Sequence, residues 1–367
     1  MTTTKRLRSL DAFRGMTIAG MILVNNPGSW AHVYPPLLHS EWNGCTPTDL
    51  VFPFFLFIVG VSTAFSFAKF DYQFNRPAAI KIIKRTVLIF LVGILLHAFP
   101  FYTLNISKFR VMGVLQRIAL AYGFGALLIL LFSRRMLIFI TALILLGYWG
   151  LMAYFGDFTL ENNFARTVDL FVFGKNHVYH GFGIPFDPEG LINTIPAVGT
   201  VIIGYLIGRL LKEFKKESAQ GLAIILIGIA LVIMGKIWDI YFPINKALWT
   251  SSYVLYTAGL ATLILMIFYW LIDIKGWKRW SEFFVVYGVN PLFAFTLSGV
   301  WAKTLYKIIK FQDADGDMTT GYSWLYKNIF VPIGGPLHGS FLFAVSHIII
   351  FWLILLILYK RKIFIKI

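Results

Sequence analysis

Ten apolar stretches, each long enough to cross a lipid bilayer as a helix, dominate the sequence. A helix of roughly 17–25 residues spans about 30 Å of hydrocarbon. The stretches lie near residues 11–27, 48–68, 82–99, 113–132, 136–155, 191–210, 220–240, 247–272, 284–302 and 339–359. With 58% hydrophobic and only 14% charged residues, a chain of 367 residues cannot bury its apolar surface in one water-soluble core. The sequence therefore predicts an all-α polytopic integral membrane protein with about ten transmembrane helices, in which residues 1–367 form a single transmembrane domain.

Lysine and arginine are distributed unevenly between these stretches. Of the 33 basic residues, 21 fall in the segments on one side of the predicted bundle and nine in those on the other. Because Lys and Arg resist translocation, the richer side is expected to be cytoplasmic, together with both termini. The net charge of +16 then belongs to short inner loops, which argues against a nucleic-acid groove. The single Cys45 excludes a disulfide framework and a multi-cysteine metal site.

Four longer segments share the predicted outer face, at 28–47, 100–112, 156–190 and 303–338. Connections longer than about 12–15 residues are often functional, and binding residues are disproportionately found on loops held by a rigid scaffold. We therefore expect the functional site on the outer side of the membrane.

Polar residues crowd into the first predicted hairpin. Asp11 and Arg14 lie three residues apart at the cytoplasmic end of the first span, where they can pair on one helix face, and Asn25 lies at its outer end. His39 precedes the second span, whose first turn carries Asp49. A histidine oriented by a carboxylate is the natural general base near neutral pH. Asp49 and Asn25 can equally be helix caps, so both interpretations stay open.

Further polar residues lie at the ends of later spans. Arg117 sits about one turn inside the fourth span, where a charge indicates a functional cavity unless its side chain snorkels to the interface. Asn290 precedes Pro291 near the cytoplasmic end of the ninth span, where it can touch a ligand or mark a kink. The remaining candidates for a binding site are Trp42, Asn43, Arg110, Asp187, Glu189, Asn245 and Lys246.

Eight short motifs follow one another in a fixed order along nearly the whole chain. They are RLRSLDAFRG at 6–15, VN at 24–25, HSEWNGCTPTDLVFPFFLFIVG at 39–60, GVLQRI at 113–118, YH at 179–180, DPEG at 187–190, INKALWTSSYV at 244–254 and RKIFIKI at 361–367. In this order they resemble the heparan-alpha-glucosaminide N-acetyltransferase family, a multi-span lysosomal enzyme and its bacterial relatives. The opening SLDAFRG also resembles the wider transmembrane acyltransferase group, in which an Arg is followed after ten residues by a His. Asn25 stands at that position here, which leaves His39 as the base candidate of the first hairpin.

The resemblance implies a transmembrane acyltransferase that moves an acetyl group from cytosolic acetyl-CoA to the amine of a glucosamine-type sugar outside. In that family the histidine matching His39 is the active-site residue, and the asparagine matching Asn25 lies beside it. His39 would act as general base with Asp49 as its orienter, and Asn25 would donate to the thioester carbonyl. A route through an acetylated His39 is the alternative. The residues expected to bind donor or acceptor are Arg14, Trp42, Asn43, Arg110, Arg117, Asp187, Glu189, Asn245, Lys246 and Asn290.

The expected partners are acetyl-CoA, an amino-sugar or glycan acceptor, the lipid bilayer and a second copy in a homodimer, with no nucleic acid. The expected location is the inner (cytoplasmic) membrane. No metal is expected, because DADGD at Asp313–Asp317 begins like a calcium loop but has no glutamate at its twelfth position, which favours a solvated turn. The alternative function is an amino-sugar transporter, or an uptake-associated membrane protein without acyl transfer. Such a transporter would spread polar residues over the whole membrane depth with two-fold internal symmetry.

Overall fold

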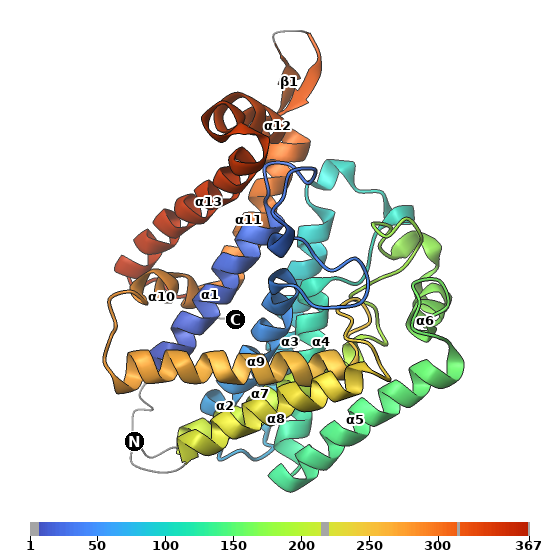
Figure 1. Cartoon of the computed structure of the whole chain (residues 1–367), viewed down its shortest axis with the longest axis vertical. Coiled ribbons are helices and arrows are strands. Elements are labelled where there is room, and N and C mark those ends of the chain that lie inside the picture. Colours follow the sequence, from blue (N-terminus) through green and yellow to red (C-terminus); the bar gives the residue numbers. More distant parts are fainter. Residues whose placement is uncertain (1–6, 214–219, 314–315, 366–367) are drawn as a thin grey trace.

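The computed structural model describes residues 7–213, 220–313 and 316–365, which form a bundle of helices with one short hairpin of strands (Figure 1). The helices are α1 (Arg8–Asn25), α2 (Val51–Ser66), α3 (Arg76–Ala98), α4 (Val114–Leu131), α5 (Arg134–Phe155), α6 (Phe164–Phe173), α7 (Thr194–Glu213), α8 (Gln220–Asp239), α9 (Ser251–Tyr269), α10 (Glu282–Gly288), α11 (Pro291–Lys303), α12 (Gly321–Leu325) and α13 (Val331–Lys360). The strands β1 (Lys310–Gln312) and β2 (Met318–Thr320) pair antiparallel.

Every predicted span coincides with a helix or a pair of helices. Within the described residues, seven helices are long and apolar enough to cross a membrane. The pair α10 and α11, bent by 82° where Asn290 precedes Pro291, is an eighth candidate. α1 and α3 form as expected, but α1 carries Arg8, Asp11 and Arg14, and the first half of α3 is similarly rich in charge. The mostly helical fold is therefore confirmed, with seven or eight helices apolar enough to span a membrane, while ten spans and cytoplasmic termini stay predictions.

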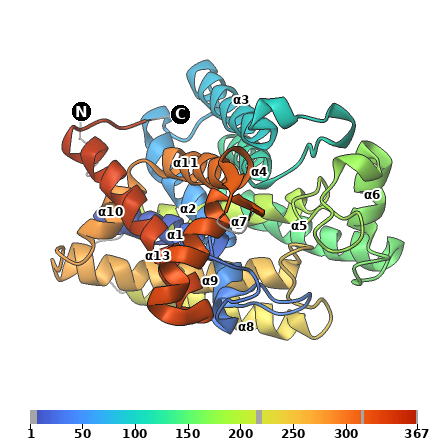
Figure 2. The ribbon, with the colours of Figure 1, turned by 90° about the horizontal axis from the view of Figure 1, so that it is seen from above.

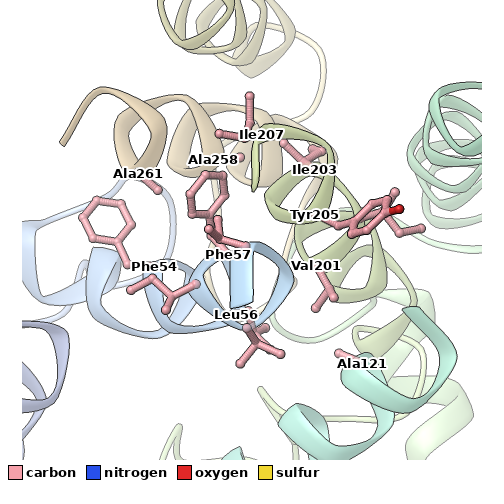
Figure 3. Close-up of a cluster of buried hydrophobic side chains, with 14 of the residues drawn as sticks. Phe54, Leu56, Phe57, Ala121, Val201, Ile203, Tyr205, Ile207, Ala258 and Ala261 are labelled. Atoms are coloured by element: carbon pink, nitrogen blue, oxygen red, sulfur yellow. The ribbon is translucent and has the colours of Figure 1, made fainter. Parts of the chain in front are cut away.

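Glycines bring α2 and α7 into direct backbone contact at the centre of the core. A Cβ atom on Gly60 of α2 would lie 2.0 Å from the carbonyl oxygen of Val201, and one on Gly204 of α7 would lie 2.2 Å from that of Phe57. Figure 3 shows Phe57 between these helices, with Ala258 of α9 beside it. Small residues at crossings are how helices pack closely inside a membrane. The close crossing fixes the axis of α2, and the short turn at residues 47–50 that leads into it carries Asp49.

The four segments predicted to share the outer face lie together on one side of the bundle. The Trp42 indole donates to the carbonyl of Phe158, which joins 28–47 to 156–190. The backbone N–H of Val111 donates to the carbonyl of His177, which joins 100–112 to the same region. Tyr34 contacts His338, which joins 28–47 to 303–338. Around this layer α6 lies at the right of Figure 1, and α11 and α13 flank α1 in Figure 2.

Sidedness can be measured on two exposed positions from opposite ends of the bundle, Glu161 and Lys278. In a background lacking Cys45, we expect a membrane-impermeant maleimide to label Glu161→Cys in intact cells and Lys278→Cys only after permeabilisation. The reason is that Lys278 lies in one of the segments rich in Lys and Arg, and such segments resist translocation and stay in the cytoplasm. Labelling of position 278 but not 161 in intact cells would reverse the predicted topology.

Candidate active site

A histidine, a carboxylate and an amine meet at the N-terminal end of α2. Oδ1 of Asp49 lies 2.7 Å from Nδ1 of His39 and 3.4 Å from Nζ of Lys246. Nζ of Lys246 lies 3.0 Å from Nδ1 of His39 and 3.5 Å from Nε2. The Asp49 side chain is 1% exposed, whereas that of His39 is 46% exposed. The carboxylate is therefore fixed and dry, while the imidazole it holds is open to a ligand.

Asp49 both orients His39 and caps the turn before α2, with a different carboxylate oxygen for each role. Its Oδ2 accepts hydrogen bonds from the backbone N–H groups of Ser40 (3.1 Å) and Thr46 (3.0 Å) and from the Thr46 hydroxyl (3.0 Å). These bonds close a capping box on the short turn 47–50 that leads into α2. The other oxygen, Oδ1, faces His39 and Lys246. If Asp49 accepts the Nδ1 proton, Nε2 of His39 is left as the basic nitrogen.

Lys246 is positioned by a second loop that is bonded to the first. Nδ2 of Asn245 donates to Oδ1 of Asn43 at a distance of 3.2 Å, although the two residues are 202 positions apart. The backbone N–H of Gly44 donates to the carbonyl of Ile244 at 2.7 Å. Asn43 and Asn245 therefore hold the loops together, and their shared bond sets Lys246 against His39.

Arg110 joins the two acids of the DPEG segment. Its Nε lies 2.9 Å from Oδ2 of Asp187, and its Nη2 lies 2.6 Å from Oδ1 of Asp187 and 2.5 Å from Oε2 of Glu189. Such a forked contact fixes both partners in orientation. Arg110 thereby holds the Glu189 carboxylate in the wall of the site. The guanidinium carbon of Arg110 lies 4.8 Å from the ring centre of Tyr179.

Arg117 is buried, at 1% exposure, and does not snorkel to the interface. Its Nη2 donates to the carbonyl of Pro188 at 2.6 Å, and its guanidinium lies 5.0 Å from the ring centre of Trp249. The buried guanidinium thus holds the backbone of the DPEG segment, whose two acids are bound by Arg110.

Asp169 of α6 belongs to the same cluster and is not among the residues predicted from sequence. Its Oδ1 accepts from the backbone N–H of Leu191 at 2.8 Å, and a Cβ atom on Gly190 would lie 1.7 Å from its Oδ2. Burial raises the pKa of Asp169 to about 7, and Asp187 adds to the rise, against the Leu191 hydrogen bond and the charge of Arg117. The only sequence signal for Asp169 is an acid within an amphipathic stretch of a long outer segment.

Two cavities meet at His39. The inner cavity holds about 200 Å³ between α1, α2, α4 and α11, and its walls are mostly apolar. Along α1 it runs from Thr17 to Asn25, about 12 Å at the helical rise. The outer cavity holds about 530 Å³, and its walls are mostly polar and aromatic. The residues that line both are Asn25, His39, Val114, Glu189 and Lys246.

The two cavities gather most of the predicted site residues. The outer one is lined by Asn25, His39, Trp42, Asp49, Arg110, Arg117, Glu189 and Lys246. Asp187 is the hydrogen-bond partner of Arg110, while Asn43 and Asn245 bond to each other beside Trp42 and Lys246 in the chain. Asn25 is exposed at the end of α1 and also borders a third cavity of about 420 Å³.

Arg14 and Asn290 lie apart from this centre. Arg14 pairs with Asp11 at 3.0 Å and donates to the Ser62 hydroxyl at 2.8 Å, below the inner end of the cavity. The amide of Asn290 is engaged by the C-terminal segment, since it donates to the carbonyl of Ile363 at 3.0 Å and accepts from the N–H of Ile365 at 2.8 Å. Asn290 therefore anchors the chain end where α10 bends into α11.

The described ranges 7–213, 220–313 and 316–365 contain no group of three His, Cys, Asp or Glu side chains that could hold a metal ion. The predicted turn at Asp313–Asp317 includes residues 314 and 315, which lie outside those ranges.

Comparison with known proteins decides the family. The family model described as "Heparan-alpha-glucosaminide N-acetyltransferase, catalytic" matches residues 6–242, well over half of the chain. The chain belongs to this N-acetyltransferase family. The resemblance inferred from the motifs is thereby confirmed, and the matched region includes His39, Asp49 and Arg117 but ends before Lys246.

Two curated members of the N-acetyltransferase family are similar to the chain. The chain is 27% identical over 426 residues to the heparan-alpha-glucosaminide N-acetyltransferase of Mus musculus, with 100% of the chain and 61% of the relative aligned. It is 29% identical over 350 residues to the Homo sapiens protein of the same name, with 79% of the chain and 52% of the relative aligned. The alignments thus cover little more than half of these relatives' length.

Proposed function

We propose that the protein is a membrane-embedded N-acetyltransferase that moves an acetyl group from acetyl-CoA to the amine of a glucosamine-type sugar. One observation carries this proposal beyond the family: His39 lies where a cavity inside the bundle, lined mostly by apolar residues, meets an outer cavity lined mostly by charged, polar and aromatic residues. The inner cavity suits the slender thioester arm of the donor, and the charged and aromatic side chains of the outer cavity suit a sugar. Donor and acceptor would then reach the same imidazole from opposite directions.

The His39 imidazole supplies the base for a direct transfer. Nε2 accepts a proton from the acceptor amine, while Asp49 holds the Nδ1 side of the ring and stabilises the imidazolium that forms. The amine attacks the thioester carbonyl, the carbon–sulfur bond breaks, and the CoA thiolate takes the proton from His39. A first transfer of the acetyl group to Nε2, followed by attack of the amine, leads to the same products.

Binding of the two substrates falls to the residues around this centre. Glu189 lines both cavities. Its carboxylate can bind the ammonium form of the acceptor before that ammonium loses its proton. Trp42 gives the outer cavity an aromatic wall suited to a sugar ring. Arg14, below the inner end of the inner cavity, would add positive charge on the path of the donor's phosphates. The donor is proposed to enter the inner cavity from the cytoplasm. The protein is proposed to lie in the inner membrane as a homodimer.

Asn25 is proposed to donate a hydrogen bond to the oxyanion that forms on the thioester carbonyl. In the described part of the chain its amide has no hydrogen-bond partner, and it lines both cavities. Asn25→Ala is therefore expected to lower turnover on the order of 10²–10³-fold, the usual loss for one such donor. Asn25→Asp has the same shape without the donor and should lose as much. Steady-state kinetics on both variants measures this, and a fully active Asn25→Asp protein would remove Asn25 from the chemistry.

The function is tested by the products of purified protein. With acetyl-CoA and glucosamine it should form N-acetylglucosamine and free CoA in equal amounts. Hydrolysis of acetyl-CoA alone would not support transfer. Counter-transport of hexosamine in proteoliposomes with no acetylated product would instead favour the amino-sugar transporter.

A further inference from the structure

The amine of Lys246 occupies the position that an acceptor amine must reach. Its Nζ lies 3.0 Å from Nδ1 and 3.5 Å from Nε2 of His39, so a shift of a few tenths of an ångström would bring it within hydrogen-bond reach of Nε2, the basic nitrogen. Lys246 also lines both the inner and the outer cavity, as His39 does. A thioester brought to His39 through the inner cavity would therefore meet a primary amine belonging to the protein itself.

The surroundings of Lys246 favour the neutral form of its amine more than those of a surface lysine do. The side chain is 22% exposed, and burial lowers its pKa, although Asp49 and Glu189 act in the opposite direction. A lower pKa increases the fraction of neutral amine, which is the form that attacks a carbonyl. Lys236 is a suitable comparison for Lys246, because its side chain is 56% exposed and pairs with Asp239 at the end of α8.

We infer that Lys246 is an internal acetyl acceptor, modified when acetyl-CoA is bound and no amino sugar fills the outer cavity. This inference rests on the proposed function, since it uses the same donor and base. His39 takes a proton from Nζ, Nζ attacks the thioester carbonyl, and the carbon–sulfur bond breaks as the amide bond forms. The CoA thiolate leaves and receives the proton from His39. Starting from the neutral amine, which the ammonium forms by giving one proton to water, atoms and charge balance without any further reactant.

The product would be a dead end for the enzyme. An amide does not pass its acetyl group to a sugar, and acetylation removes the positive charge that lies 3.4 Å from Asp49. An acceptor in the outer cavity would shield Lys246, because both lie against His39. The transferase would thus be inactivated by its own donor when the acceptor is scarce.

The test is peptide mass spectrometry on purified protein incubated with acetyl-CoA that carries a deuterated acetyl group. Label should accumulate on Lys246 above the level on Lys236, and excess glucosamine should suppress it. His39→Ala should lower labelling of Lys246 on the order of 10²-fold, the lower end of what a general base contributes. Native protein should lose transferase activity during preincubation with acetyl-CoA, whereas Lys246→Arg, which has no acylable primary amine, should not decline further from its own starting rate.

Two outcomes would overturn the inference. One is label on Lys246 no higher than on Lys236, and the other is label that His39→Ala leaves unchanged. If the protein acetylates glucosamine but Lys246 stays unlabelled in incubations without glucosamine, the inference fails and the proposed function stands. If neither glucosamine nor Lys246 receives label, the proposed function itself fails.

Discussion

Replacement of His39 by alanine is expected to lower acetyl transfer by a factor on the order of 10²–10⁴, the contribution of a positioned general base. If the acetyl group passes through the imidazole covalently, transfer should stop altogether. The variant should still fold, because His39 lies on a loop with its side chain 46% exposed and contributes little to packing. The measurement is the initial rate of N-acetylglucosamine formation, together with binding of acetyl-CoA, which should persist.

His32 provides a matched control for this substitution. It lies on the same loop and is exposed, but its Nδ1 lies 3.4 Å from the Tyr326 hydroxyl. His32 also borders a separate small cavity. His32→Ala should therefore keep most of the transfer rate. A His39→Ala protein that transfers at the native rate would end the proposed chemistry at this residue.

Asp49→Asn is expected to reduce the rate by about 10²-fold or more while leaving the protein folded. The asparagine oxygen can still accept the capping bonds from Ser40 and Thr46. Its NH₂ group would then occupy the place of Oδ1, facing the Nδ1 side of His39 and the ammonium of Lys246. Donors would face donors there, so the imidazole would lose its orientation and its counter-charge.

Thr46→Ala probes the capping half of the same carboxylate. It removes the hydroxyl that lies 3.0 Å from Oδ2 of Asp49 and leaves Oδ1 in place. We expect a loss of about 1 kcal/mol in the free energy of unfolding, typical of a lost cap, with a much smaller loss of rate than Asp49→Asn. Thermal unfolding and initial rates of both variants separate the two roles. An Asp49→Asn protein with native rate and lowered stability would make Asp49 a cap alone.

The helices are largely predictable because the thickness of a bilayer imposes a length on every apolar stretch. Each predicted span has its helix, and the bend at Asn290 falls where the sequence places a residue before Pro291. What the apolar lengths do not determine is which helices cross the membrane. α1 holds Arg14 among apolar residues by pairing it with Asp11, and that pairing depends on helix spacing.

The site is predictable only where its parts are close in the chain. His39 and Asp49 are ten residues apart in one hairpin, and their 2.7 Å contact could be anticipated from that proximity. The contact of Lys246 with His39 spans 207 residues, and no periodicity links two separate loops. Asp169 was missed for the same reason, since its role comes from packing against Gly190 and Leu191.

Sided acetyl transfer in proteoliposomes tests the proposed function most directly. Vesicles would hold labelled acetyl-CoA on the side of the basic loops and glucosamine only on the opposite side, which the outer cavity faces. We predict labelled N-acetylglucosamine on the glucosamine side, free CoA on the donor side, and neither with His39→Ala. Product formed only when both substrates are on the same side, or glucosamine crossing the membrane without acetylation, would contradict transfer of an acetyl group through the bundle.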